Sequence, residues 1–164
     1  MIKYIITMIL AALTLMANPK GNSMENLTEI YLGGGCFWGT QGYFDLINGV
    51  VYSEVGYANG ISDQTSYNQI ARTDHAEVVR LKFDANRVDI NEILEHYFRI
   101  IDPFSINKQG NDIGRQYRTG IYYSDDKLKS VIEDFISRKQ AKFTKPIAVE
   151  IEPLKNYIKA EEYH

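Results

Sequence analysis

The sequence is poor in cysteine, since its 164 residues include only Cys36. A single cysteine excludes a disulfide within the chain and a structural zinc site built from pairs of cysteines. Three roles stay open for this thiol: an inert buried side chain, a reactive nucleophile, or a bridge to another molecule. The residues around it must decide among them.

Positive charge and histidine are also scarce. Lysine and arginine number 18 against 21 aspartate and glutamate residues, and the net charge is −3 at pH 7. No basic stripe is present, so we expect no nucleic acid among the partners of this chain. Only three histidines are present. His75 and Glu77 lie two positions apart on a predicted strand and could in principle share a metal ion. Because histidines are so few, we expect no metal site.

The first residues have the pattern of a signal peptide rather than of a folded domain. Lys3 precedes an apolar stretch over residues 4–17, and a polar segment follows. This stretch is short for a membrane-spanning helix, which needs about 20 apolar residues. We predict a signal peptide over residues 1–17 with cleavage near Ala17, export to the periplasm or out of the cell, and no stable membrane association after processing. A translation start at Met24 would instead give a cytoplasmic protein.

The remainder is predicted to be one domain over residues 27–164, after a short linker over residues 18–26. Hydrophobic periodicity predicts strands over residues 27–32, 50–57, 75–83, 117–123 and 147–152, and helices over residues 36–47, 90–101 and 125–142. Asp89 and Ser124 stand where side chains cap the second and third helices. Strands and helices mix without strict alternation, so we expect an α+β fold, a two-layer sandwich of helices on a mixed β-sheet.

Residues 33–35 are three glycines that separate the first predicted strand from Cys36. Glycine adopts backbone angles forbidden to other residues and lets a substrate approach the main chain. Cys36 then falls in the first turn of a helix, where free N–H groups and the helix dipole favour the thiolate over the thiol. Phe37 and Trp38 add large apolar surfaces beside the sulfur. This arrangement favours a reactive thiol over an inert one.

Motifs of other enzyme classes do not fit these residues. A nucleophile elbow requires glycine two positions after the nucleophile, where this sequence has Trp38. The same tryptophan breaks the dinucleotide-binding pattern, and the sequence has no Gly-Lys-Ser or Gly-Lys-Thr as in a phosphate-binding P-loop.

The segment Gly-Gly-Gly-Cys-Phe-Trp-Gly at residues 33–39 resembles the signature of the peptide methionine sulfoxide reductase A family. The resemblance extends over residues 30–164. Further blocks stand in the family's order at residues 55–57, 75–79, 109–112 with 116–118, and 160–164. The resemblance implies a ferredoxin-like α+β fold. It also implies an oxidoreductase that repairs oxidised proteins by reducing methionine S-sulfoxide, free or within a protein.

The resemblance implies a role for each catalytic residue. Cys36 would attack the sulfoxide sulfur and become a sulfenic acid, and Glu77 would give a proton to the oxygen. Tyr67 and Tyr117 are similar to the family's tyrosines whose hydroxyls hydrogen-bond that oxygen. From pattern alone, Glu77 would be a solvated strand residue, and neither tyrosine stands out among the twelve in the chain.

Three further residues are expected to bind the substrate. By the resemblance, Phe37 and Trp38 form the pocket for its methyl group, and Asp112 is a carboxylate that orders the site and contacts the substrate. Taken alone, the aromatic pair is also compatible with core packing, and Asp112 is more typical of a turn.

The main departure from the family concerns how oxidised Cys36 would be reduced again after each reaction. Many relatives carry a second, resolving cysteine near the C-terminus, and this sequence has none. We expect no bound cofactor and an external thiol reductant: thioredoxin, glutaredoxin with glutathione, or dithiothreitol in the test tube. A truncated C-terminus, a domain normally fused there, and a resolving thiol on another chain are alternatives. Two rival functions stay open, a thiol peroxidase and a module that binds oxidised methionine without turnover.

Overall fold

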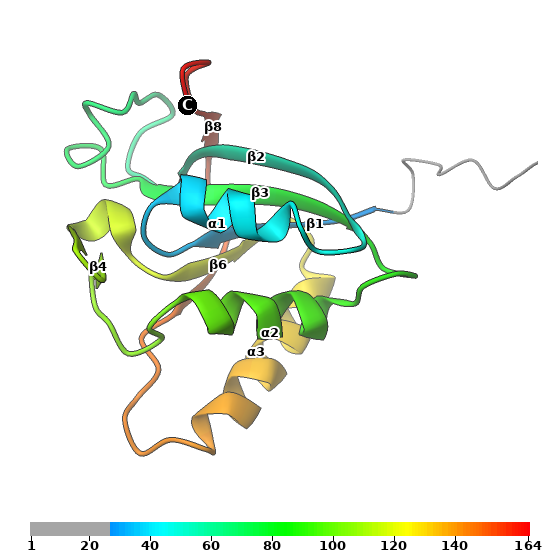
Figure 1. The fold of residues 1–164 in the computed structure, drawn as a ribbon. Helices are drawn as coiled ribbons and strands as arrows, with labels where there is room; N and C mark the ends of the chain where they lie inside the picture. Colours follow the sequence, from blue (N-terminus) through cyan, green and yellow to red (C-terminus); the bar gives the residue numbers. More distant parts are fainter. Residues whose placement is uncertain (1–26) are drawn as a thin grey trace, which may run out of the picture.

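The computed structural model describes residues 27–164, in which three helices pack against a twisted sheet (Figure 1). The predicted signal peptide over residues 1–17 and the linker over residues 18–26 lie outside the described residues. Within residues 27–164, no helix has both the length and the apolar character needed to cross a membrane.

The described part contains one main sheet, three α-helices, a short 3-10 helix and a small hairpin. The strands of the main sheet are β1 (Leu27–Gly33), β2 (Val50–Ala58), β3 (Ala76–Asp84), β6 (Gly120–Tyr123), β7 (Glu150–Pro153) and β8 (Tyr157–Lys159). The helices are α1 (Phe37–Phe44), α2 (Ile90–Ile100), α3 (Lys127–Gln140) and the 3-10 helix η2 (Arg115–Tyr117). The hairpin consists of β4 (Lys108–Gln109) and β5 (Asp112–Ile113).

The main sheet is mixed, with strand order β7-β6-β1-β3-β2-β8. Its central strand β1 is antiparallel to both β3 and β6, whereas β7 runs parallel to β6. On one side of β2, Tyr57 pairs with Glu77 of β3. On the other side, Tyr57 pairs with Ile158 of β8. The last strand therefore brings the C-terminal residues close to the start of β3.

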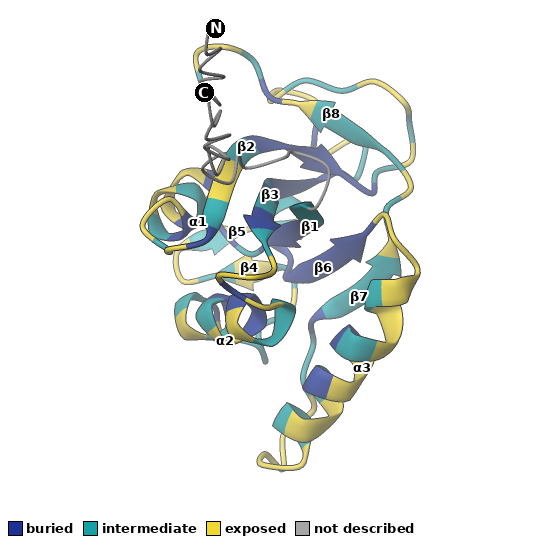
Figure 2. Cartoon of the chain, turned by 90° about the vertical axis from the view of Figure 1, so that its right-hand side faces the viewer, coloured by how far each residue is buried: buried dark blue, intermediate teal, exposed yellow. Residues whose placement is uncertain are grey.

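The helices pack their apolar sides on one face of the sheet to form the main core. Figure 2 shows the buried residues concentrated in the central strands and on the helix sides that face them. Side chains alternate between the two faces of β3, and Val79 and Leu81 lie on the face that packs into this core. Glu77, two positions before Val79, lies on the same face. The predicted α+β sandwich of helices on a mixed sheet is confirmed.

Helix α2 begins where the sequence predicts it. The side chain of Asp89 accepts a hydrogen bond from the N–H of Glu92 at 3.0 Å, and the Glu92 side chain accepts one from the N–H of Asp89 at 3.0 Å. This capping box satisfies two N–H groups that have no partner within the helix. The buried residues of α2 are Ile93, Leu94 and Tyr97.

Several other predicted boundaries are wrong. Ser124 does not cap α3, because the helix begins only at Lys127, whose N–H donates to the side chain of Asp125 at 2.9 Å. Tyr117 lies in η2 rather than in a strand, because the chain turns at Gly114 (φ 139°) and enters the sheet only at Gly120.

The structure also contains elements that the periodicity did not predict. The short strand β8 and the β4–β5 hairpin are each too brief to show an alternating pattern. The first helix ends at Phe44 rather than near residue 47, and the strand predicted over residues 147–152 begins only at Glu150.

Candidate active site

The site lies at the N-terminal end of α1, where the chain leaves the sheet through residues 33–35. Gly35 has φ +77°, in the left-handed region that favours glycine. A Cβ atom on Gly34 would lie 2.7 Å from Cγ2 of Ile101, and one on Gly35 would lie 2.9 Å from Cβ of Gln109. The glycines were expected to allow unusual backbone angles and a close approach of substrate. The positive φ of Gly35 agrees with the first expectation, and the side chains beside Gly34 and Gly35 leave no room for a Cβ atom where the chain turns before Cys36.

Cys36 is exposed and stands as the N-terminal cap residue of α1, one position before the first helical turn in which it was predicted. Two carboxylates lie at this helix end. The N–H of Cys36 donates to Oδ2 of Asp112 at 3.3 Å, and the N–H of Phe37 donates to Oε2 of Glu77 at 3.1 Å. Both N–H groups lack partners within the helix, and acidic side chains satisfy them favourably at this end of the dipole.

Glu77 is almost completely buried, with 2% of its surface exposed. Burial, followed by the charge of Asp112, raises its pKa to about 7, against the opposing hydrogen bond from the Phe37 N–H. At neutral pH this carboxyl is therefore present in both its protonated and its ionised form. It can release a proton near physiological pH, which an ordinary surface glutamate cannot do.

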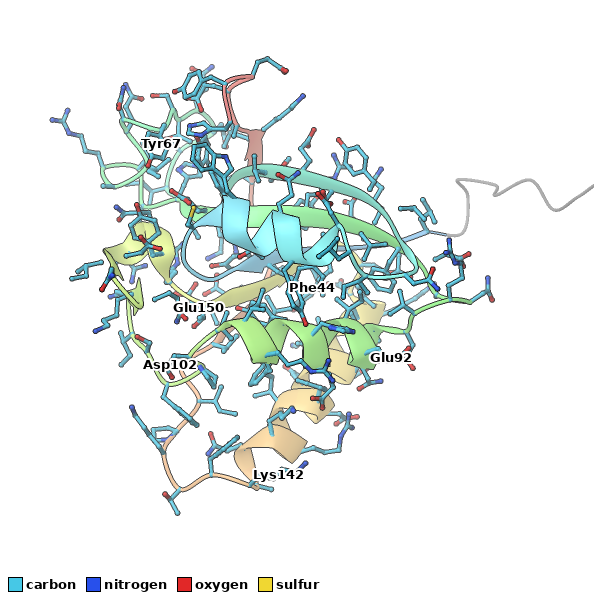
Figure 3. The ribbon with its side chains drawn as sticks, viewed as in Figure 1. Phe44, Tyr67, Glu92, Asp102, Lys142 and Glu150 are labelled. Carbon is cyan, nitrogen blue, oxygen red and sulfur yellow. The ribbon has the colours of Figure 1, made fainter. Side chains whose placement is uncertain are left out.

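Two tyrosines approach the site from different segments. Tyr67 lies on the loop between β2 and β3, beside the N-terminal end of α1 (Figure 3), and Tyr117 ends η2. Burial, together with the charge of Glu77 and a hydrogen bond with the Tyr67 side chain, raises the pKa of Tyr117 to about 12. The Tyr117 hydroxyl therefore keeps its proton at neutral pH and is available as a hydrogen-bond donor.

All seven residues predicted for the site line one pocket of about 140 Å³. Its walls are formed by Cys36, Phe37, Trp38, Tyr67, Glu77, Asp112, Tyr117 and His164. Phe37 is buried and forms the inner wall, whereas Trp38 is 53% exposed and stands at the rim. The seven predicted residues thus meet around a single thiol, although they span 81 positions of sequence from Cys36 to Tyr117.

The eighth residue, His164, was not predicted individually. Its ring lies 4.7 Å from that of Tyr67, 5.3 Å from that of Phe37 and 5.4 Å from that of Trp38, measured between ring centroids. Its carbonyl oxygen accepts a hydrogen bond from the indole N–H of Trp38 at 3.0 Å. The block over residues 160–164 was the only sequence signal, because nothing local relates it to the cysteine.

No group of three histidine, cysteine, aspartate or glutamate side chains in residues 27–164 is arranged to hold a metal ion. His75, which precedes β3, is fully buried. Its Nδ1 lies 2.8 Å from Oγ1 of Thr73, and its ring packs against Gly60, where a Cβ would lie 2.1 Å from Nδ1. Through these contacts His75 anchors the loop before β3, and it does not line the pocket.

Comparison with known proteins gives one consistent answer. The family described as peptide methionine sulfoxide reductase matches residues 28–164. The reduced form of Mxr1 from Saccharomyces cerevisiae is 36% identical, with a TM-score of 0.77 over 85% of this chain and 82% of that one. Methionine sulfoxide reductase A of Corynebacterium diphtheriae is 31% identical, with a TM-score of 0.76 over 87% and 74%. Mxr1 in complex with Trx2 is 29% identical, with a TM-score of 0.62 over 84% and 83%. The chain therefore belongs to the peptide methionine sulfoxide reductase family.

Proposed function

We propose that this chain reduces methionine S-sulfoxide, free or within proteins, with Cys36 as the nucleophile and an external thiol as the reductant. The observation that carries the proposal is the composition of one pocket. An exposed thiol, a buried carboxyl with a pKa of about 7 and two tyrosines share it with an aromatic wall. This set of groups suits attack on a sulfur atom coupled to protonation of an oxygen.

In the first step, the Cys36 thiolate forms a bond to the sulfoxide sulfur. The sulfoxide oxygen is a poor leaving group, so the S–O bond breaks as the oxygen accepts one proton from Glu77 and one from solvent and leaves as water. The hydroxyls of Tyr67 and Tyr117 hydrogen-bond the oxygen while negative charge develops on it. The cysteine sulfur is now joined to a methionine sulfonium.

In the second step, water attacks the Cys36 sulfur and methionine leaves with the electron pair of the S–S bond. The proton released by the water returns to Glu77. Cys36 becomes a sulfenic acid, so its sulfur has been oxidised by two electrons and the methionine sulfur has been reduced by two. The net change is that the sulfoxide is reduced to methionine and Cys36 is oxidised to a sulfenic acid, whose oxygen comes from the attacking water.

The remaining pocket residues are assigned to substrate binding. The buried face of Phe37 and the rim position of Trp38 suit the S-methyl group, which has no polar atoms. Asp112 holds the main chain at Cys36 through the 3.3 Å hydrogen bond from its N–H. This contact fixes where the thiol stands relative to the pocket.

Recycling of Cys36 is assigned to an external thiol, since the 164 residues hold no second cysteine. One thiol attacks the sulfenic acid, water leaves and a mixed disulfide forms. A second thiol then attacks this disulfide and restores Cys36. Exposure of Cys36 supports direct access of the reductant, and the related Mxr1 has been found in complex with Trx2. Thioredoxin is therefore the first reductant to test, followed by glutaredoxin with glutathione.

The test follows methionine formed from the S- and R-sulfoxides by the purified chain beginning at Asn18. Dithiothreitol, the thioredoxin system and the glutaredoxin system are compared, with Cys36→Ser as the control. We expect turnover of the S epimer with dithiothreitol and none with Cys36→Ser. Failure to form methionine even in a single turnover would contradict the proposal. Consumption of hydrogen peroxide in its place would favour a thiol peroxidase.

We further propose that residues 1–17 direct export of the chain and are removed near Ala17. Support comes from Lys3 and the apolar stretch that follows it. N-terminal sequencing of the protein recovered from its native cell tests this directly. A mature N-terminus near Asn18 is expected, and one at Met24 would contradict export.

A further inference from the structure

The residues that follow β8 extend along the active site. The N–H of Ala160 donates to the carbonyl of Val55 at 3.1 Å, which continues the attachment of β8 to β2. Glu161 comes next and stands beside Tyr57, a fully buried residue of β2. The position of Glu161 is therefore set by the sheet and not by the loops around the pocket.

The carboxylate of Glu161 joins the sheet to the loop that carries Tyr67. The hydroxyl of Tyr57 donates to Oε2 at 2.6 Å, and the backbone N–H of Tyr67 donates to Oε1 at 2.9 Å. Each carboxylate oxygen thus has one donor, and the two donors lie on different segments. Tyr57 is fully buried in the core, whereas Tyr67 is 40% exposed on a loop without strand or helix.

Glu161 is suited to this contact because it is ionised at neutral pH. Burial acts to raise its pKa, but the hydrogen bonds from Tyr57 and from the Tyr67 N–H outweigh burial, so the pKa lies below its usual range. A charged acceptor forms stronger hydrogen bonds than a neutral one. Oε2 also lies 3.8 Å from Nε2 of His164, whose ring packs on that of Tyr67.

We propose that Glu161 is a positioning residue for sulfoxide reduction, and that it acts by holding Tyr67 in place over the pocket. The inference rests on the function proposed above, in which the Tyr67 hydroxyl donates to the sulfoxide oxygen. Without the carboxylate, the backbone of Tyr67 loses its tie to the sheet. The hydroxyl then points at the oxygen in only a fraction of the molecules.

The test measures kcat and KM for methionine S-sulfoxide, and the single-turnover rate of methionine formation, in four proteins. These are the wild type, Glu161→Ala, Tyr67→Phe and the double variant. Glu161→Ala is expected to lower the single-turnover rate about tenfold with little change in KM, because displacement of a catalytic group weakens transition-state contacts. In the Tyr67→Phe background the hydroxyl is already absent. The same substitution is expected to cost less than about twofold there.

Two further variants separate positioning from a general effect on folding. Glu162→Ala removes the neighbouring carboxylate, which is 91% exposed and pairs with Lys159 at 3.1 Å, and it is expected to leave the rate unchanged. Glu161→Gln keeps an oxygen for the Tyr67 N–H, so it is expected to recover most of the rate. Thermal unfolding of every variant identifies any that no longer fold.

Equal losses from Glu161→Ala in the wild-type and Tyr67→Phe backgrounds would overturn the proposal, because Glu161 would then act by another route. No loss in the wild-type background would overturn it as well. Failure of the proposed function looks different, since the wild-type chain itself would form no methionine. The two failures are therefore distinguished by the wild-type measurement alone.

Discussion

Replacement of Glu77 by glutamine changes the pH dependence of stability in a way that follows from its environment. The carboxyl is 2% exposed and accepts the N–H of Phe37 at 3.1 Å. Glutamine has nearly the same shape and can still accept that hydrogen bond, but it cannot ionise. The substitution therefore removes the buried charge and little else.

The magnitude follows from the pKa, which burial raises from 4.5 to about 7. Each tenfold difference in proton affinity corresponds to about 1.4 kcal/mol, so ionisation of Glu77 destabilises the folded state by about 3 kcal/mol. The raised pKa determines the sign. Well below pH 4.5 both states are protonated and there is no cost. The cost grows between pH 4.5 and 7, where only the unfolded chain ionises, and it is complete above pH 7.

The assay is urea unfolding of the Glu77→Gln variant and of its parent at pH 5 and pH 8. Both proteins carry Cys36→Ser, so that they differ only in the side chain at position 77. Relative to its parent, Glu77→Gln is expected to be about 2.5 kcal/mol more stabilising at pH 8 than at pH 5. If the substitution changed the free energy of unfolding equally at both pH values, the argument that ionisation of Glu77 destabilises the folded state would be refuted.

Three other predictions concern the pocket and its support. The ratio of single-turnover rates, wild type over Glu77→Gln, is expected to fall as the pH rises through about 7, because the wild type loses its proton donor; a constant ratio across this range would exclude Glu77 as the acid. Trp38→Ala removes the exposed wall of the pocket and is expected to raise KM for the S-sulfoxide about tenfold. An unchanged KM would place the methyl group elsewhere. The buried Tyr97 hydroxyl donates to the carbonyl of Gly33 at 2.5 Å and accepts the N–H of Gly120 at 3.1 Å. These two glycines lie in β1 and β6, so the hydroxyl links the two strands. Tyr97→Phe is therefore expected to lower the free energy of unfolding by about 1 to 3 kcal/mol in urea titrations. An unchanged value would show that this link does not stabilise the sheet.

Local patterns in the sequence predict the elements that depend on local physics. The alternation before and through β3 predicts a strand, and the resemblance adds the role of proton donor for Glu77 on it. Asp89 predicts the start of α2 because the capping box needs only residues within one turn. The glycines before Cys36 indicate a tight turn for the same reason, and Gly35 has the positive φ that such a turn requires.

Features that depend on long-range pairing could not be predicted in this way. β8 has only three residues, and it is a strand because β2 offers a free edge. The contacts of Glu161 with Tyr57 and Tyr67 cross 104 and 94 positions of sequence, respectively. His164 enters the pocket through the same pairing. Its role was therefore invisible to periodicity, even though the terminal block that contains it resembled the family.

The central claim is that Cys36 reduces the sulfoxide and is itself oxidised to a sulfenic acid, and one measurement tests this claim most directly. The wild-type chain and Cys36→Ser are each mixed with one equivalent of methionine S-sulfoxide without reductant, and methionine and the mass of the cysteine-containing peptide are measured. We predict one methionine formed per wild-type chain, one added oxygen on Cys36, and no methionine from Cys36→Ser. Methionine formed by Cys36→Ser, or formed by the wild type while Cys36 stays unmodified, would contradict the account.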